Sequence, residues 1–335
     1  MDIQKIPCEP MIKEQIRHVL QNFQCIRLHF TAEALEDIHF SSYMGSTIRG
    51  AFGVALKRSV CVTKQNDCSA CMLQHSCVYS YIFETPIPAD SHVMKKQTHV
   101  PHPFSFSDMS DLHKHEYSSG EIFRFSLCLM GKSIDFLPYC IYAMIRLGQF
   151  GMGRGRGRFK LLHIQEMDAY HQCCDDIYVD DQLHMPQQFL SIETAEKLMP
   201  QYVNSKHQIT LDFISPFRIK YQNKICDHVA FHIIIRSLMR RLANLAYFHS
   251  NSRFNLDFNE IIEKARSVRI SKNNMTWYDW GRYSTRQKEW MNFGGLVGDI
   301  TYEGDIRAFI PLLILGSWVN VGKGTAFGLG NYRIC

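Results

Sequence analysis

The sequence predicts an α+β protein built from two tandem ferredoxin-like (RRM-like) domains, with a cysteine-rich metal-binding insertion in the first. Three observations lead to this prediction. The strands and helices indicated by hydrophobic periodicity follow the same order in both halves of the chain. A glycine-rich segment precedes the last strand of each half, and four cysteines lie close together in the first half. The 335 residues are enough for two domains of ordinary size.

The first half indicates a split βαβ arrangement. Strands are expected where apolar and polar residues alternate, and helices where apolar residues recur every three or four positions. The expected elements are, in order, a strand over 26–30, a helix from Tyr43 to about Ser59 capped by Ser41 and Ser42, a strand over 121–130, a helix over 136–147 that ends at Gly148, and a strand that ends at Ile164. These elements define a first domain over 1–164.

The second half repeats this order. The expected elements are a strand over 208–214, a helix capped by Asp227 and running to about Tyr247, a strand over 296–302, a short helix over 309–315, and a strand over 332–334. We place this second domain at 206–335. The intervening segment is strongly acidic, with eight Asp and Glu against one Lys over 165–200. Residues 165–205 are therefore expected to form an acidic linker.

Composition narrows the class of protein. A hydrophobic fraction of 46% and a charged fraction of 21% are typical of a globular chain. There is no run of eighteen apolar residues and no secretory signal at Met1–Lys5, so we expect a cytoplasmic protein without a membrane partner. Residues 201–335 carry 18 Lys and Arg against 10 acids. Such a basic half suits a polyanionic ligand, the alternative being a merely solvated face.

The segment Val321–Gly330 contains four glycines and Lys323. Glycines let the backbone turn sharply and approach a ligand, and the lysine adds a cation. A dinucleotide-binding turn would follow a strand and open a helix, and a nucleotide-triphosphate loop would contain Gly-Lys-Ser/Thr. The segment fits neither description, so both of these ligand classes are excluded.

A family resemblance rests on these glycines. The pattern Gly-x-Gly-x3-Gly-x-Gly near the C-terminus, preceded by Gly294–Gly298, resembles the RAMP superfamily of CRISPR-associated proteins. More narrowly, the chain is similar to the repeat-processing endoribonucleases called Cas6. Supporting matches are found at Ile48–Gly53, at Leu211–Lys220 and at Arg282–Gln287. The resemblance implies a pair of ferredoxin-like folds that hold a CRISPR repeat RNA hairpin, with subunits of a CRISPR effector complex as further partners and no small-molecule substrate.

The resemblance also implies a reaction and a place for it. A ribose 2′-hydroxyl attacks the adjacent phosphate and leaves a 2′,3′-cyclic phosphate, without a cofactor for catalysis. This chemistry needs a base, an acid and a cation, for which His, Lys and Arg are suited. Relatives keep their catalytic residues on or just after the first helix. The candidates there are His39, Tyr43, Lys57 and His75, with a structural role among the cysteines as the alternative for His75.

Basic side chains and glycines are the candidates for RNA binding. Near Arg282, basic residues alternate with Trp277, Trp280 and other aromatic residues, which suits phosphate binding and base stacking. For the tryptophans we prefer a hairpin packed on the second domain, and for the arginines RNA binding. The alternative for the Gly-Arg repeat at 153–158 is an exposed loop. The RNA-binding candidates are Arg49, Arg58, Arg154, Arg156, Arg158, Arg282, Ser284, Arg286, Gly322, Lys323, Gly324, Gly328 and Gly330.

Four cysteines follow the first predicted helix with the spacing Cys-x6-Cys-x2-Cys-x5-Cys, at Cys61, Cys68, Cys71 and Cys77. One Cys-x-x-Cys pair plus two further thiolates suits a tetrahedral Zn²⁺. The metal would be structural because protein ligands fill all four positions. An iron–sulfur cluster uses the same ligands, and free thiols are a further alternative.

The sequence therefore predicts a metal-independent endoribonuclease that cleaves precursor CRISPR RNA within its repeats. A non-catalytic RNA-binding RAMP subunit of a CRISPR effector complex is the alternative. A third hypothesis is a zinc-dependent nucleic-acid binder in which the cysteine segment contacts the ligand.

Overall fold

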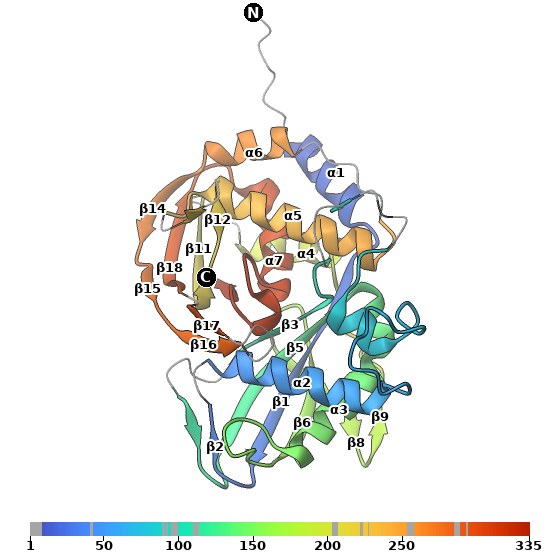
Figure 1. The fold of residues 1–335 in the computed structure, drawn as a ribbon. Helices are drawn as coiled ribbons and strands as arrows, with labels where there is room; N and C mark the ends of the chain where they lie inside the picture. The colour runs from blue at the N-terminus through green and yellow to red at the C-terminus, as the bar shows by residue number, and fades with distance from the viewer. Residues whose placement is uncertain are drawn as a thin grey trace, which may run out of the picture.

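The structure is a computed structural model that describes residues 9–40, 43–88, 91, 93–94, 100–109, 114–202, 207–221, 224–226, 228–252, 258–284, 289–292 and 294–335. Two antiparallel sheets with their helices form the two halves of the molecule, which Figure 1 shows with the C-terminal half above the N-terminal half. None of the helices in the described ranges is long and apolar enough to cross a membrane.

The N-terminal sheet has the ferredoxin-like topology. Its strand order is β3-β5-β1-β6-β7, so the first four strands in chain order are arranged 2-3-1-4. One helix connects the first strand to the second, and another connects the third to the fourth, as a split βαβ unit requires. The elements are β1 (Gln24–Ala34), α2 (Met44–Val60), β3 (Phe104–Ser107), β5 (Ile122–Met130), α3 (Leu137–Phe150), β6 (Phe159–Met167) and β7 (Cys173–Asp176).

The C-terminal sheet repeats this topology. Its order β14-β18-β11-β19 is again 2-3-1-4, and a short further strand pairs with β18. The predicted tandem ferredoxin-like fold is therefore confirmed. The elements are β11 (Gln208–Phe217), α5 (Phe231–His249), α6 (Asn259–Arg266), β14 (Arg269–Asn273), β15 (Thr276–Tyr278), β18 (Gly295–Glu303), α7 (Ile310–Val319) and β19 (Tyr332–Ile334).

Shorter elements lie at the edges of the two sheets and between them. They are α1 (Glu9–Leu20), β2 (Ile38–His39), the π-helical turn η1 (Ser80–Glu84), β4 (Glu116–Tyr117), η2 (Gly131–Phe136), β8 (Tyr178–Val179), β9 (Gln182–Leu183), β10 (Leu190–Ser191), α4 (Ile192–Leu198), η3 (Met199–Tyr202), β12 (Lys220–Tyr221), β13 (Lys224–Ile225), β16 (Gly281–Ser284), β17 (Glu289–Asn292), η4 (Arg307–Phe309) and η5 (Thr325–Phe327).

Some predicted boundaries are wrong. Strand β6 continues past Ile164 to Met167, and β11 continues past residue 214 to Phe217. Helix α3 does not end at Gly148 but continues to Phe150. A Cβ atom on residue 148 would lie 2.5 Å from the carbonyl oxygen of Phe159, so this glycine serves close packing of α3 on β6. The proposed capping residues Ser41, Ser42 and Asp227 lie outside the described residues.

Helix α1 was not predicted, and it packs on the domain at the other end of the sequence. Ile12, Ile16 and Val19 follow helical spacing and are buried in the same apolar cluster as α5 and α7. Figure 1 shows α1 beside α5 and α6. Residues from the extreme N-terminal part of the described chain therefore complete the C-terminal core.

The acidic segment contains regular structure. Strand β10 pairs with β1, and α4 lies against α7. This segment thus contacts both halves of the molecule. The domain boundaries at 164 and 206 stay predictions.

Candidate nucleic-acid interface

The two halves meet at the C-terminal end of α7. Arg27 on β1 donates from Nη2 to the carbonyl oxygens of Ser317 and Trp318, at 2.6 and 3.0 Å. Arg241 on α5 donates from Nε and Nη2 to the carbonyl oxygen of Val319, at 2.9 and 2.7 Å. A helix C-terminus carries partial negative charge and unpaired carbonyl groups, so two guanidinium groups stabilise it. They fix the point at which the glycine-rich segment begins.

The buried charge of Arg27 is balanced locally. Its Nη1 lies 3.5 Å from a carboxylate oxygen of Asp108 and 3.2 Å from Nδ1 of His171. Burial raises the pKa of Asp108, but the Arg27 charge, the hydrogen bonds from Ser126 and Ser107 and the electrostatic interaction with His171 together outweigh burial, so the pKa is lowered. Burial, and then the Arg27 charge, lowers the pKa of His171 to about 4. The imidazole is therefore neutral near pH 7 and accepts from Arg27.

The glycine-rich segment, residues 321–330, is held by its own backbone and by β11. The amides of Lys323 and Gly330 donate to the carbonyl oxygens of Arg218 and Pro216, at 2.8 and 3.0 Å. Gly330 has φ +70°, and a Cβ atom there would lie 1.8 Å from the carbonyl oxygen of Val321. Only glycine fits such a position.

The four glycines predicted to bind RNA differ in their exposure. Gly328 and Gly330 are buried, and Gly322 and Gly324 are half-buried. Their conformations and close contacts show that they shape the segment, and Lys323 is its exposed cation.

This segment packs on the start of α2. The hydroxyl of Tyr43 donates to the carbonyl oxygen of Gly328 at 3.1 Å, and the Tyr43 ring lies 5.2 Å from that of Trp280. The guanidinium of Arg49 lies between the rings of Phe83 and Phe327, 4.4 and 4.5 Å from their centres. Tyr43 is buried, which raises the pKa of its hydroxyl. Both residues therefore join the domains at this contact.

Basic side chains gather beside the glycine-rich segment. Partial burial, followed by the charges of Lys220, Arg218 and Arg240, lowers the pKa of Lys323. These four residues, here called the Lys323 cluster, come from the glycine-rich segment, β12, the end of β11 and the exposed face of α5. Lys220, Arg240 and Lys323 are exposed. Mutually repelling cations are stabilised by a polyanion, so this cluster is suited to bind phosphates.

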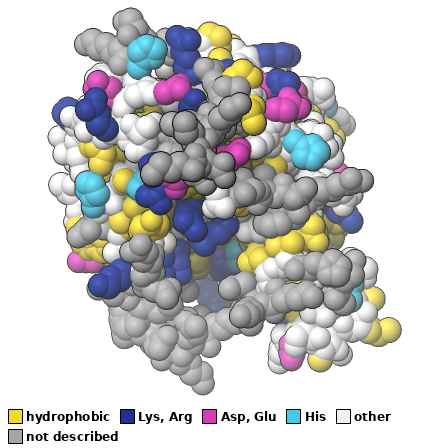
Figure 2. All heavy atoms as spheres, turned by 90° about the horizontal axis from the view of Figure 1, so that it is seen from above, with side chains coloured by type: hydrophobic (Ala, Val, Ile, Leu, Met, Phe, Trp, Pro, Cys, Tyr) yellow, Lys and Arg dark blue, Asp and Glu magenta, His cyan; other side chains and the backbone are white. Residues whose placement is uncertain are grey.

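Figure 2 shows one face of the molecule, on which Lys and Arg side chains gather beside a hollow. Basic side chains thus concentrate on part of this surface. The feature agrees with the basic character of the second half of the sequence.

His39 and Arg154 lie side by side. They form an antiparallel bridge in which the Arg154 amide donates to the His39 carbonyl oxygen at 2.8 Å. Directly opposed residues in such a bridge have Cβ atoms about 5 Å apart and side chains on one face. His39 Nδ1 lies 3.3 Å from a carboxylate oxygen of Glu116, and 47% of the His39 side chain is exposed. An exposed imidazole is thus held beside a carboxylate, on a backbone bridge to the exposed Arg154.

The two other arginines of this loop differ in their surroundings. Arg156 is exposed. Arg158 donates to a carboxylate oxygen of Glu36 at 2.6 Å, and this ion pair raises the pKa of Arg158. Arg158 therefore ties the loop to the chain that leads from β1 to α2.

Lys57, Arg58 and His75 lie at the opposite end of α2. Lys57 Nζ donates to the carbonyl oxygen of Asn66 at 3.0 Å, and Arg58 lies over the ring of Phe150. Fourteen residues of helix separate Tyr43 from Lys57, about 21 Å at 1.5 Å per residue. The structure brings His39 near Arg154 but does not bring Lys57 or His75 to the same place.

The predicted basic–aromatic segment is described in part. Arg282 and Ser284 lie on β16, whose backbone pairs with β17. Their side chains and the whole of Arg286 lie outside the described structure. Trp280 is buried between Tyr43 of the first half and Leu329 of the second half, while Trp277 is 44% exposed.

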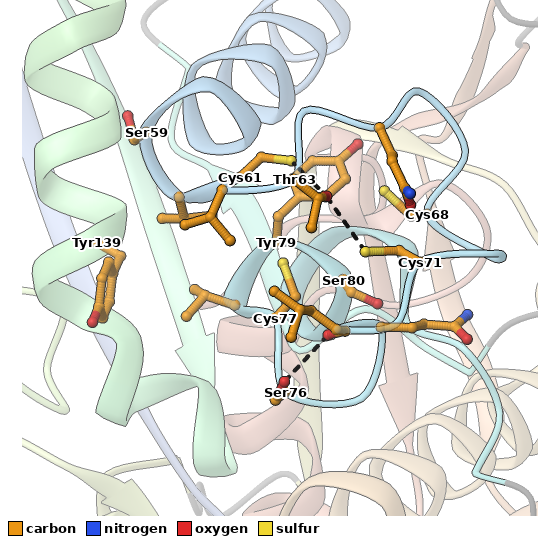
Figure 3. A pocket seen from close by; sticks show the side chains of 16 residues that line it. Ser59, Cys61, Thr63, Cys68, Cys71, Ser76, Cys77, Tyr79, Ser80 and Tyr139 are labelled. Carbon is orange, nitrogen blue, oxygen red and sulfur yellow. Dashed lines mark hydrogen bonds between the residues drawn. The ribbon is translucent and has the colours of Figure 1, made fainter.

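The four cysteines of the predicted metal site line one pocket of about 340 Å³. Figure 3 shows their side chains around Thr63. Across the described residues, no three His, Cys, Asp or Glu side chains already stand close enough to hold a metal ion. The metal site stays a prediction.

A cleft that the sequence did not indicate lies on the open face of the N-terminal sheet. Its volume is about 510 Å³, and His29, Arg124 and His163 line it. His29 lies 3.1 Å from the Ser126 hydroxyl, and burial lowers its pKa. The alternation at 26–30 places His29 opposite the core, which was a usable signal. The register of the neighbouring strands β5 and β6 brings Arg124 and His163 beside His29, and this register could not be predicted from the sequence.

Comparison with known proteins agrees with this fold. A family model described as "CRISPR-associated endoribonuclease Cas6" matches residues 211–332. The model of the AF_1859_N family, described as "N-terminal domain", matches residues 23–190. An uncharacterized protein of Archaeoglobus fulgidus is 22% identical over 303 residues, which are 88% of this chain and 93% of that protein.

Solved structures share the fold at low identity. Thermus thermophilus Cas6 has a TM-score of 0.52 and 13% identity, over 93% of this chain and 99% of its own. A Cas6 product complex has a TM-score of 0.57 and 12% identity over the same shares of the two chains. A chain of a partial Cas6-RT-Cas1–Cas2 complex has a TM-score of 0.56 and 15% identity over 95% of this chain, which spans only 47% of that longer one. The chain belongs to the AF_1859_N family, whose model matches residues 23–190, and its residues 211–332 match the model of the Cas6 endoribonucleases.

Proposed function

We propose that this protein is an endoribonuclease that cleaves precursor CRISPR transcripts within their repeats, by 2′-hydroxyl attack and without a metal ion. The match of residues 211–332 to the Cas6 endoribonuclease model supports the RNA-cleaving activity. The observation that carries the proposed site is the exposed imidazole of His39, which lies beside Glu116 and Arg154 just before helix α2.

The chemistry assigned to these residues follows from what the reaction requires. The 2′-oxygen forms a bond to phosphorus, the bond from phosphorus to the 5′-oxygen breaks, and a 2′,3′-cyclic phosphate is left. One proton leaves the 2′-hydroxyl and one reaches the 5′-oxygen. We assign one of these transfers to His39 and the stabilisation of the phosphorane charge to Arg154. Glu116 orients the ring through Nδ1, which leaves Nε2 for the RNA.

The RNA would be held mainly through its phosphates. The Lys323 cluster supplies cations beside the glycine-rich segment, and Arg156 extends the basic surface near His39. The chain between these surfaces is short: Tyr43 follows His39 by four positions, at most about 14 Å of extended chain. Tyr43 in turn contacts Gly328. One RNA strand of a few nucleotides would therefore reach from one surface to the other.

Three sequence candidates are not assigned chemical roles. Tyr43 is buried and donates to a backbone carbonyl group, while Lys57 and His75 lie at the far end of α2. We propose that His39 is the catalytic residue among the four.

The partners follow from the same assignment. Solved relatives include a Cas6 product complex and a Cas6-RT-Cas1–Cas2 complex. We propose that this chain binds a CRISPR repeat RNA hairpin and that other CRISPR-associated proteins are its protein partners.

The test is cleavage of a labelled repeat hairpin by the purified protein in excess EDTA. A single cut is expected with the native chain and with Lys57→Ala, and the cleavage rate should fall at least about 100-fold with His39→Ala, which should still bind the RNA. Tight binding without a cut by the native chain would establish the non-catalytic RNA-binding subunit instead. Cleavage that requires added Mg²⁺ or Mn²⁺, ions that prefer oxygen ligands, would overturn the proposed mechanism.

A further inference from the structure

The segment between α2 and η1 has little apolar packing of its own. Val62 is 75% exposed and Met72 is 89% exposed. Residues 61–77 form bends and turns with no regular helix or strand. Apolar burial therefore contributes little to holding this segment in one conformation.

The segment carries four thiols at the points where the chain changes direction. Cys61 directly follows α2, and Cys77 directly precedes the helical turn at Val78. Cys68 and Cys71 lie on either side of one turn, in which the Cys71 amide donates to the Cys68 carbonyl oxygen at 3.3 Å. A crosslink among the four would join the end of α2, this turn and the start of η1.

The four sulfur atoms face one space. They line the pocket of about 340 Å³, and Figure 3 shows Cys61 and Cys71 on either side of Thr63. The Thr63 hydroxyl lies 3.8 Å from the sulfur of Cys61 and 3.5 Å from that of Cys71. The sulfur atoms are still too far apart to hold an ion as they stand. Metal binding would therefore draw the four side chains closer together within the pocket.

The side chains that line the pocket limit the metal ions that it can bind. Its lining includes four cysteines but no Asp, Glu or His. Sulfur-only ligands in tetrahedral number suit Zn²⁺ and exclude Mg²⁺ and Ca²⁺, which prefer oxygen. We infer that Cys61, Cys68, Cys71 and Cys77 bind one structural Zn²⁺ ion.

Lys57 gains a role from this inference. Four thiolates and one Zn²⁺ carry a net charge of −2. Lys57 lies beside Cys68, and its Nζ donates to Asn66 within the same segment. Its ammonium group would offset part of that charge. The zinc also lies at the opposite end of α2 from His39 and keeps no coordination position for water, so its role is structural.

Zinc binding by residues 61–77 would also affect the contact between the two domains, because η1 follows this segment and packs near that contact. The ring of Phe83 in η1 would lie 2.3 Å from a Cβ atom on residue 53, so it packs directly on α2 at Gly53. The same ring stacks on Arg49, which also contacts Phe327 of the glycine-rich segment. Zinc would thus hold the start of η1 in place, and with it the Phe83 ring that packs on Arg49 at the contact between the domains.

The first measurement is the metal content of the reduced, purified protein by mass spectrometry. About one zinc ion per chain is expected. The double variant Cys68→Ser/Cys71→Ser should lose the ion. The matched control Cys226→Ser/Cys335→Ser should keep it, because neither residue lines the pocket.

Cobalt replacement of the native ion keeps the test decisive if the double variant fails to fold. The native chain should show the absorption of tetrahedral Co²⁺ with four thiolate ligands. Absence of metal from the native chain, iron with acid-labile sulfide in place of zinc, or a cobalt spectrum with oxygen ligands would each overturn the inference. An equal loss of zinc from the control variant would overturn it as well.

Discussion

The hydroxyl of Tyr43, the residue before helix α2, donates a hydrogen bond of 3.1 Å to the carbonyl oxygen of Gly328 in the glycine-rich segment. The two residues are 285 positions apart in the sequence and belong to the two different ferredoxin-like units. Tyr43 is buried, so water does not reach this position, and the phenol supplies the hydrogen bond that the Gly328 carbonyl group needs. The phenol therefore joins the two domains.

Replacing Tyr43 with Phe should destabilise the protein with little effect on the chemical step. The buried Gly328 carbonyl group would lose its partner, so the free energy of unfolding should fall by about 1–3 kcal/mol. Urea denaturation measures this change. Tyr142→Phe is the control, because Tyr142 is 52% exposed. Unchanged stability together with a 100-fold loss of cleavage would instead assign the phenol to catalysis.

Two glycines with positive φ should respond differently to replacement by Ala. Residue 155 has φ +89° and open space around a Cβ atom, so Gly155→Ala should cost only backbone strain, about 1 kcal/mol. At residue 330 a Cβ atom would also collide with the Val321 carbonyl oxygen, so Gly330→Ala should cost more than about 3 kcal/mol. Equal losses in denaturation midpoint would contradict the packing of the glycine-rich segment described above.

Mild acid should destabilise the native protein through its buried histidines. Burial lowers the pKa of His249 to about 4, although its bond to the Pro101 carbonyl oxygen opposes this. The unfolded chain, with a His pKa of about 6.5, binds more protons below that pH. Stability should therefore fall as pH drops from 6.5 toward 4, by about 2 kcal/mol at pH 5 for such a group.

The matched variant is His249→Gln, whose amide can still donate to Pro101 and accept from Tyr81. Urea denaturation at pH 7 and pH 5 should show a smaller loss of stability for this variant than for the native chain. The same loss in both proteins would show that His249 is not buried in its neutral form.

Removing one cation from the Lys323 cluster should weaken RNA binding in a salt-dependent way. Lys323→Ala should reduce the slope of log affinity against log salt concentration by about 1, because one phosphate contact is lost. Lys197→Ala is the control, since Lys197 is exposed on α4 in the acidic segment. Filter binding over a range of salt concentrations measures both slopes. Equal slopes for the two variants would exclude Lys323 from the RNA interface.

Much of the fold could be predicted because it depends on local periodicity. Each predicted strand and helix overlaps an observed one, and the glycine segments precede β6 and β19, the fourth strand of each ferredoxin-like unit. Helix α1 carried the same kind of signal in Ile12, Ile16 and Val19, but its place in the C-terminal core depends on contacts that periodicity does not contain.

The site was less predictable because side-chain roles depend on the other domain. Arg27 alternates with apolar residues and would face solvent in an isolated sheet, yet α7 covers it and uses its charge. Tyr43 is a polar residue near the first helix, but the glycine-rich segment encloses it. The sequence identified the strand that carries Arg27 and the start of the helix after Tyr43, but it did not show that these two side chains join the domains.

The most direct test of the proposed reaction is cleavage in EDTA of two repeat hairpins that differ by one oxygen atom. One hairpin has ribose throughout, and the other has a 2′-deoxy sugar at the cut site. We predict a single cut in the ribose hairpin, ending in a 2′,3′-cyclic phosphate, and an intact deoxy hairpin to which the protein still binds. A cut in the deoxy hairpin, or a product with a free 3′-hydroxyl group, would contradict 2′-hydroxyl attack.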